Sequence, residues 1–195
     1  MLAAIILSGG SSSRMGSPKA LLAYQGRPFL EHLLEVTKHP KIGVRRVVLG
    51  AHADPIGKAV RLEAEEVVIN ENWEEGQLSS IQAGLRSLPA GTDGALICLV
   101  DHPLISATLV DGLVEQFYAT KALVAVPVFE GRRGHPVIFA EALYEELQKA
   151  PVEFGARSVV WAHKNEVSEY ITAEEGCVVN LNDPDTFARL GRSGS

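Results

Sequence analysis

Short, uninterrupted apolar runs recur along this chain, and between them the apolar residues are spaced as in helices. The first run, residues 2–7, is closed by Gly9 and Gly10, which is typical of a strand buried on both faces. The pattern predicts strands at 3–7, 46–49, 66–69, 95–100, 123–128 and 136–139. It predicts helices at about 29–38, 55–62, 78–88, 107–119, 140–148 and 156–163.

Alternating strands and helices indicate an α/β fold, in which a mostly parallel sheet carries helices on both faces. We therefore expect a single-domain, Rossmann-like three-layer sandwich over residues 1–190. Strands 123–128 and 136–139 differ from the rest, because the glycine-flanked loop between them favours a hairpin. The glycine- and serine-rich residues 191–195 are predicted to form a flexible tail.

Composition narrows the class of protein. With 46% hydrophobic and 22% charged residues the chain is expected to fold. A net charge of −6 argues against nonspecific nucleic-acid binding, and no apolar stretch approaches the ~20 residues of a membrane span. The first apolar run is too short for a signal peptide, so we expect a cytoplasmic protein. The two cysteines, Cys98 and Cys177, have no zinc or disulfide spacing, and Cys98 is predicted to be a core thiol.

The loop after the first strand has the chemistry of a phosphate site. Gly9 and Gly10 let the backbone approach a ligand, the serines at 11–13 offer donors, and Arg14 and Lys19 add two cations. The loop has neither the ending of a P-loop nor the glycine spacing of a dinucleotide fold. Because the chain is acidic overall, a polyanionic ligand has to be held by local positive charge such as this.

Other polar segments also follow predicted strands, at 70–80, 101–103 and 131–135. Ligands of open α/β sheets bind beyond the carboxyl ends of the strands, so these segments are expected to converge. Asp101 ends the apolar run 95–100, where a carboxylate could hold Mg²⁺ together with substrate phosphates. The alternative for Asp101 is a turn residue before Pro103.

An ordered set of motifs covers nearly the whole chain: Leu7-Ser8-Gly9-Gly10 with Arg14-Met15-Gly16 and Pro18-Lys19, Asn72-Trp73 with Gly76 and Ser79-Ser80, Asp101-x-Pro103, Gly131-x-Arg133-Gly134-His135-Pro136, and Asn182-Asp183-Pro184. Together these motifs resemble the molybdenum cofactor cytidylyltransferases of the MobA-like NTP transferase superfamily.

The resemblance implies transfer of a cytidylyl group from CTP to the phosphate of the molybdenum-pterin cofactor, with release of pyrophosphate. It implies Arg14, Lys19 and Asp101 as catalytic residues and a Mg²⁺ ion held by Asp101 and Asn182. The residues implied for the nucleotide are Leu7, Ser8, Gly9, Gly10, Ser11, Arg14, Lys19, Asn72, Ser79 and Ser80. Those implied for the acceptor are Arg132, Arg133, Gly134 and His135. A molybdenum enzyme or its chaperone is a further implied partner.

Several of these residues also have simpler interpretations. Ser79 and Ser80 could cap a helix. Trp73 is interpreted as a packing residue rather than as a platform on which a base stacks. The arginines at 132 and 133 could form an exposed basic turn. Asp183 is assigned to capping a last short helix, with Asn182 directed toward the metal.

The nucleobase is the open part of the prediction. Cytidylyl members of the family tend to carry Ala where this chain has Gly9, and guanylyl members tend to carry Gly. The segment 131–136 favours CTP, and we give it more weight because it is longer. A nucleotidyltransferase for another phosphate and a non-catalytic cofactor-binding chaperone are the alternative functions.

Overall fold

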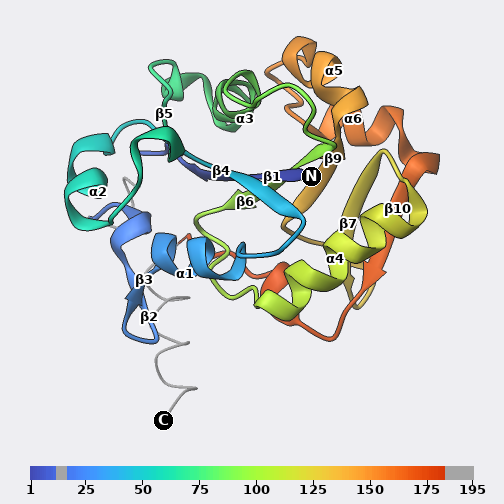
Figure 1. Cartoon of the computed structure of the whole chain (residues 1–195), viewed down its shortest axis with the longest axis horizontal. Helices are drawn as coiled ribbons and strands as arrows, with labels where there is room; N and C mark the ends of the chain where they lie inside the picture. The colour runs from blue at the N-terminus through green and yellow to red at the C-terminus, as the bar shows by residue number, and fades with distance from the viewer. Residues whose placement is uncertain (12–16, 183–195) are drawn as a thin grey trace.

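The computed structural model of this chain describes residues 1–11 and 17–182 (Figure 1). Its centre is an eight-stranded sheet with the strand order β10-β7-β9-β6-β1-β4-β5, and β8 pairs with β7. The strands are β1 (Leu2–Ser8), β4 (Ile42–Leu49), β5 (Val67–Ile69), β6 (Gly94–Leu99), β7 (Val124–Phe129), β8 (Arg132–Arg133), β9 (Val137–Ala140) and β10 (Val167–Ile171). A separate antiparallel pair joins β2 (Ala23–Tyr24) to β3 (Arg27–Pro28).

Six α-helices cover the sheet within the described part of the chain. They are α1 (Phe29–Val36), α2 (Ala53–Ala59), α3 (Gln77–Arg86), α4 (Ala107–Thr120), α5 (Tyr144–Lys149) and α6 (Arg157–Ala162). Short 3₁₀ turns lie at Lys19–Leu21, Ala64–Glu66, Trp73–Glu75, Glu141–Leu143, Lys164–Glu166 and Glu175–Cys177.

The central strand β1 shows how the sequence builds three layers. All seven of its residues are buried, and successive side chains point to opposite faces of the sheet. Ala4 and Ile6 pack in a cluster with residues of α1, α2 and α4, whereas Ile5 and Leu7 pack in a cluster with residues of α3, α5 and α6. Figure 1 shows the same division, with α3, α5 and α6 above the sheet and α1 and α4 below it. The predicted three-layer α/β fold is confirmed.

The predicted hairpin is present, with an added strand. β7 and β8 pair antiparallel, with Val128 opposite Arg133, and a tight turn joins the two strands. The following strand, β9, also pairs antiparallel with β7, and it lies between β7 and β6. β9 therefore runs against the otherwise parallel strands β6, β1, β4 and β5 beside it.

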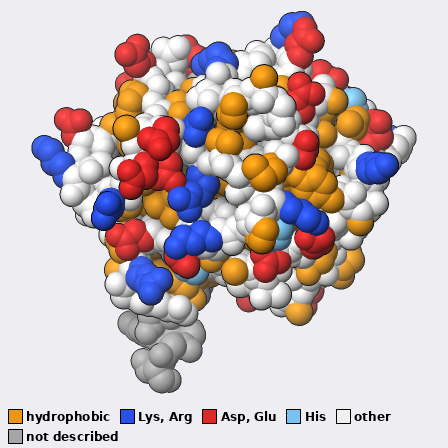
Figure 2. All heavy atoms as spheres, viewed as in Figure 1, with side chains coloured by type: hydrophobic (Ala, Val, Ile, Leu, Met, Phe, Trp, Pro, Cys, Tyr) orange, Lys and Arg blue, Asp and Glu red, His pale blue; other side chains and the backbone are white. Residues whose placement is uncertain are grey.

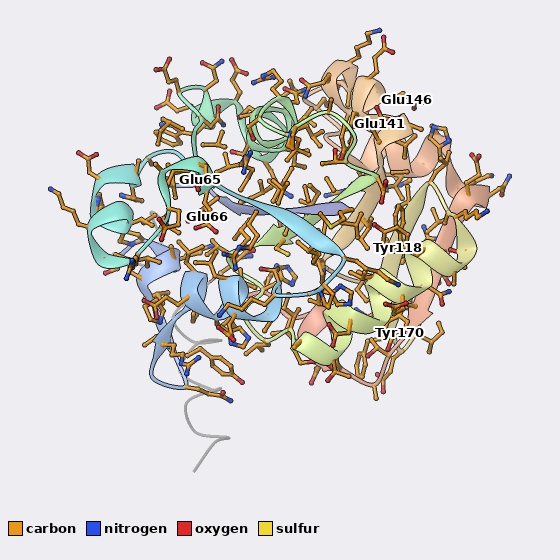
Figure 3. The ribbon with its side chains drawn as sticks, in the orientation of Figure 1. Glu65, Glu66, Tyr118, Glu141, Glu146 and Tyr170 are labelled. Carbon is orange, nitrogen blue, oxygen red and sulfur yellow. The ribbon has the colours of Figure 1, made fainter. Side chains whose placement is uncertain are left out.

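Besides the short strands β2, β3 and β8, which were not predicted, two longer strands depart from the sequence prediction. β10 was not predicted, because its alternating residues Val-Ser-Glu-Tyr-Ile contain no apolar run. It pairs parallel with β7, and its Tyr170 lies against α4, where a Cβ added to Gly112 would be 2.2 Å from the Tyr170 hydroxyl (Figure 3). β4 begins at Ile42, earlier than the predicted start at 46, because Gly43 and Arg45 interrupt the apolar pattern although they lie within the strand. Arg45 forms an ion pair with Glu66 at 2.7 Å.

The remaining general expectations concern the surface and the cysteines. On the face shown in Figure 2, acidic and basic side chains are interspersed. No helix among the described residues is long and apolar enough to cross a membrane. Cys98 is fully buried, as predicted, and burial raises the pKa of its thiol to about 12. The tail at 191–195 lies outside the described residues, and the domain boundary at 190 stays a prediction.

Candidate functional site

A pocket of about 210 Å³ opens at the carboxyl ends of β1 and β6. β1 ends at Ser8 and the neighbouring parallel strand β6 ends at Leu99, so the loops that follow them meet at one edge of the sheet. The lining residues are Leu7, Ser8, Gly9, Gly10, Pro18, Lys19, Ala20, His52, Ile56, Trp73, Gly76, Gln77, Ser80, Leu99, Val100 and Asp101. The predicted convergence of the loops after these strands is therefore present.

The first loop is packed tightly against its neighbours. The carbonyl of Gly9 accepts a hydrogen bond from the amide of Ala51 at 3.1 Å. A Cβ added to Gly9 would lie 2.9 Å from the Ser80 hydroxyl oxygen, and one added to Gly50 would lie 2.5 Å from the Gly9 carbonyl oxygen. The Gly50 Cβ would also lie 2.6 Å from Trp73, so Trp73 is a packing residue as interpreted, and it lines the pocket as well.

Lys19 lies between two oxygen-bearing side chains from distant parts of the chain. Its Nζ is 3.5 Å from Oδ2 of Asp101 and donates to Oδ1 of Asn182 at 2.5 Å. Asn182 is placed there by its neighbour, because the amide of Leu181 donates to the Asp101 carbonyl at 2.7 Å. The Lys19 and Asp101 side chains are only 19% and 22% exposed, so the interaction is partly shielded from water. Arg14 and Asp183 lie outside the described residues.

The donor set at this position suits a hard divalent cation. Asp101 offers a carboxylate and Asn182 an amide oxygen, which are the ligands that Mg²⁺ and Mn²⁺ prefer. Within residues 1–11 and 17–182, no group of three or more His, Cys, Asp or Glu side chains is placed to hold a metal ion. An ion held by Asp101 and Asn182 would complete its coordination with substrate phosphates and water, as Mg²⁺ usually does.

The segment before α3 is braced by a buried amide that the sequence analysis did not single out. Asn70 is 4% exposed, and its Nδ2 donates to the hydroxyls of Ser79 at 2.8 Å and Ser80 at 3.0 Å. Its Oδ1 accepts from the backbone amide of Asn72 at 3.1 Å. Ser79 lies 2.8 Å from the carbonyl oxygens of both Asn72 and Gly76, so its hydroxyl holds the loop together.

These contacts separate the predicted nucleotide residues into two groups. Ser80 lines the pocket, whereas Ser79 and Asn72 do not and support the loop instead. His52 also lines the pocket, and its Nε2 lies 2.7 Å from the Ser11 carbonyl oxygen. The sequence analysis missed His52, although it follows β4 and the strand-end rule that located the other loops applies to it.

The segment 131–136 is divided in a similar way. Arg132 and Arg133 are exposed in β8, and Arg133 forms an ion pair with Glu169 at 2.8 Å. Gly134 is buried against the neighbouring backbone, since a Cβ there would be 2.3 Å from the Cys177 carbonyl oxygen. The His135 amide donates to that same oxygen at 2.8 Å. The backbone therefore fixes the position of His135.

The rings of His135 and His102 lie together, with centroids 5.0 Å apart. Burial lowers the pKa of His135 to about 4 and also lowers the pKa of His102. Both rings are therefore neutral at pH 7, and the pair connects His135 to Asp101, the residue that precedes His102.

His135 also lines a second pocket of about 550 Å³. This pocket shares Gly76 and Gln77 with the first, so the two adjoin at the start of α3. Arg133 and Gly134 line it as well, whereas Arg132 lines neither pocket. The structure thus places three of the four predicted acceptor residues at a cavity beside the first pocket.

Comparison with known proteins decides the family. Residues 4–167 match the MobA-like NTP transferase domain. The chain belongs to this family. Nicotine blue oxidoreductase of Paenarthrobacter nicotinovorans is 33% identical over 148 residues, which cover 71% of each protein. A probable molybdenum cofactor guanylyltransferase of Bacillus cereus is 29% identical over 196 residues, covering 96% of this chain and 94% of the relative.

Solved structures show the same fold. Rv0371c from Mycobacterium tuberculosis superimposes with a TM-score of 0.82 at 25% identity, covering 97% of this chain and 96% of that one. A structure of Rv0371C in complex with manganese has a TM-score of 0.80 at 23% identity and covers 98% of both chains. The predicted membership of the MobA-like superfamily is confirmed, whereas the roles of individual residues in this MobA-like chain stay predictions.

Proposed function

We propose that this nucleotidyltransferase of the MobA-like family transfers a cytidylyl group from CTP to the terminal phosphate of the molybdenum-pterin cofactor and releases pyrophosphate. The observation that carries the proposal is the position of Lys19, between Asp101 and Asn182 at the edge of the first pocket. One cation and two metal-type oxygen ligands are thereby gathered where a triphosphate would lie.

The proposed reaction does not require a strong general base. A phosphate monoester has a second pKa near ~6, so at neutral pH the attacking oxygen is already mostly ionised. The main obstacle is repulsion between an anionic nucleophile and an anionic triphosphate, which positioning and charge neutralisation overcome. We assign Lys19 and Arg14 to the triphosphate, with Lys19 stabilising the pyrophosphate as it leaves.

A divalent metal completes this assignment. Asp101 and Asn182 would hold the ion, which when bound supplies positive charge to the reacting phosphates. We propose Mg²⁺ as the natural ion, and the manganese complex of Rv0371C supports a divalent cation in a protein of the same fold. Activity should be lost on chelation with EDTA and restored by Mg²⁺ or Mn²⁺.

Two observations favour GTP as a second candidate for the nucleotide. The curated relatives include proteins named molybdenum cofactor guanylyltransferase, and Gly9 stands where cytidylyl members tend to carry alanine. In this chain the space beside Gly9 is taken by the Ser80 hydroxyl, at 2.9 Å from a Cβ placed there. CTP remains the first candidate because the segment 131–136 resembles the corresponding segment of the cytidylyl members. In this chain the backbone of Gly134 and His135 lies against the Cys177 carbonyl oxygen.

The test is pyrophosphate release with CTP, GTP and UTP, each with and without molybdenum cofactor. The proposal predicts release that requires the cofactor and is fastest with CTP. A faster reaction with GTP would establish the second candidate, and release with another phosphate compound alone would point to a different acceptor. Binding of cofactor without any release would show a non-catalytic binder and refute the proposal.

A variant of Lys19 tests the residue that carries the argument. Lys19→Ala should lower kcat about 100-fold or more, because an oriented charge at the transition state is worth that much. Lys164→Ala is the matched control, since Lys164 is exposed and lines neither pocket. Rates equal to wild type in Lys19→Ala, at saturating CTP and metal, would remove Lys19 from the mechanism.

A further inference from the structure

The second pocket has apolar surfaces against which the face of a ring could pack, and polar side chains at its edges. Its base is formed by one face of the sheet, from β6, β7 and β9, and its wall by the first turns of α3. The residues in these positions are Ile97, Val126, Val137, Phe139, Leu78 and Ile81. A cavity of about 550 Å³ falls in the range that binds small molecules, ~300–1,000 Å³.

Two exposed aromatic rings stand at the mouth of this pocket. Phe154 is 50% exposed and Trp161 is 55% exposed, and their rings meet edge to face with centroids 6.1 Å apart. Val152 beside them is 64% exposed. All three belong to residues 151–162 and line the same cavity. Exposed large apolar side chains gathered at one place on a surface mark a binding site.

The polar groups of the pocket are few and unevenly placed. His135 lies at the end that reaches His102 and hence Asp101. Arg157 lies at the aromatic end, and its exposed side chain makes no hydrogen bond or ion pair with any residue in 1–11 or 17–182. Arg133 is engaged by Glu169, and the carboxylates of Glu75 and Glu153 complete the charged groups on the rim.

We propose that this pocket binds the ring system of the acceptor, a fused heterocycle with one flat face that carries a phosphate monoester. The ring lies against Trp161 and Phe154, and the phosphate points past Gly76 and Gln77 toward Asp101 in the first pocket. The pocket offers contacts of the required kind, because a heterocycle that packs on an aromatic side chain needs no fixed hydrogen-bond partner. The inference rests on the proposed function, since it is the transfer reaction that requires an acceptor beside the triphosphate.

The energy of stacking gives the expected size of the change in acceptor binding. Replacing one stacking aromatic residue by alanine typically costs ~1–3 kcal/mol for a base, and ~1.4 kcal/mol corresponds to a tenfold change in affinity. Trp161→Ala and Phe154→Ala should each raise KM for molybdenum cofactor about tenfold. KM for the nucleotide and kcat at saturating acceptor should stay within about twofold of wild type, because neither residue lines the first pocket.

Conservative and matched variants separate stacking from general damage. Trp161→Phe should keep most of the acceptor affinity, since it retains an aromatic face. Ile171→Ala is the control, because Ile171 is 71% exposed on the edge strand β10 and lines neither pocket. Thermal unfolding of every variant should match wild type within a few degrees, because the replaced side chains are largely exposed.

A binding measurement makes the test independent of turnover. The probe is 6-hydroxymethylpterin, a fused heterocycle without phosphate, followed by the anisotropy of its own fluorescence. It should bind wild type and Trp161→Phe, and bind Trp161→Ala about tenfold more weakly. Pterin binding that depends on Trp161, without any nucleotidyl transfer, would uphold this inference and refute the proposed function.

The opposite result is equally informative. Normal transfer with an unchanged acceptor KM in Trp161→Ala and Phe154→Ala would uphold the proposed function and overturn this inference. Pterin binding that is unaffected in both variants would also overturn it. Such results would leave the aromatic pair to another occupant, such as a protein that receives the product.

Discussion

Acid should destabilise the folded chain in a way that can be traced to one buried ring, His135. Burial lowers its pKa to about 4, from an ordinary value of 6.5. Below pH 6.5 the unfolded chain therefore binds a proton at this position, while the folded chain does not bind it until the pH approaches 4. The proton favours the unfolded state, so His135 makes the free energy of unfolding fall as the pH falls through this window.

The magnitude follows from the two pKa values. Over the whole window the difference is worth about 3 kcal/mol, and about 2 kcal/mol of it is lost between pH 7 and pH 5. This is a large share of the ~5–15 kcal/mol that stabilises a typical domain. The two neighbours that act on the ring do so in opposite directions, because the charge on His102 lowers the pKa of His135 and that of Asp101 raises it.

Urea unfolding at pH 7 and pH 5, without nucleotide or metal, measures the effect. His135→Gln removes the titrating group, so its loss of stability between the two pH values should be about 2 kcal/mol smaller than that of wild type. Because the change in the free energy of unfolding between the two pH values is compared, any destabilisation by the substitution that does not depend on pH cancels. Equal losses in wild type and His135→Gln would refute the reasoning.

His163 provides a control of opposite sign. Hydrogen bonds to Glu166 and Glu146 raise its pKa, so protonation of this ring stabilises the folded state. That contribution is present at low pH and is lost as the pH rises through the folded pKa. His163→Gln should therefore lose more stability than wild type between pH 7 and pH 5, and His135→Gln less.

Two further substitutions test the packing around the pockets. Gly134→Ala should lower the free energy of unfolding, measured in urea, by about 1–3 kcal/mol, because the added methyl would lie 2.3 Å from the Cys177 carbonyl oxygen. Gly57→Ala is the control: Gly57 lies in α2 with open space around it, so this change should raise the free energy of unfolding by about 0.5–1 kcal/mol. Asn70→Ala should cost about 1–3 kcal/mol and raise KM for the nucleotide, since it frees the Ser80 hydroxyl at the pocket wall. A stable Gly134→Ala protein, or an unchanged KM in Asn70→Ala, would contradict these accounts.

The sequence predicted the layers of the fold well because the buried parallel strands are continuous apolar runs. β1 and β6 are nearly all buried and bounded by glycine or aspartate, so their positions could be predicted from hydrophobicity alone. β10 could not, because it lies at the edge of the sheet and its Ser168 and Glu169 interrupt the pattern. Its place is decided by pairing with β7, which is an interaction between distant parts of the chain.

The first pocket could be predicted for a similar reason. Many of its lining residues lie in loops that follow strands whose carboxyl ends share one edge of the sheet, so the ends of the predicted strands indicate where the pocket is. Asn70 was missed because it acts through side-chain hydrogen bonds to Ser79 and Ser80, and no sequence motif indicates such hydrogen bonds.

The second pocket depends on features that strand ends do not reveal. Its base exists because β9 turns back between β7 and β6, which brings Val137 and Phe139 beside Ile97 and Val126 on one face. Its rim comes from the turn before α6 and from α6 itself, which follow another helix, α5. A sequence pattern that places ligand-binding loops after parallel strands therefore locates the first pocket. The second pocket, which we propose for the acceptor, becomes visible only when the antiparallel strand β9 and the exposed aromatic pair are seen together.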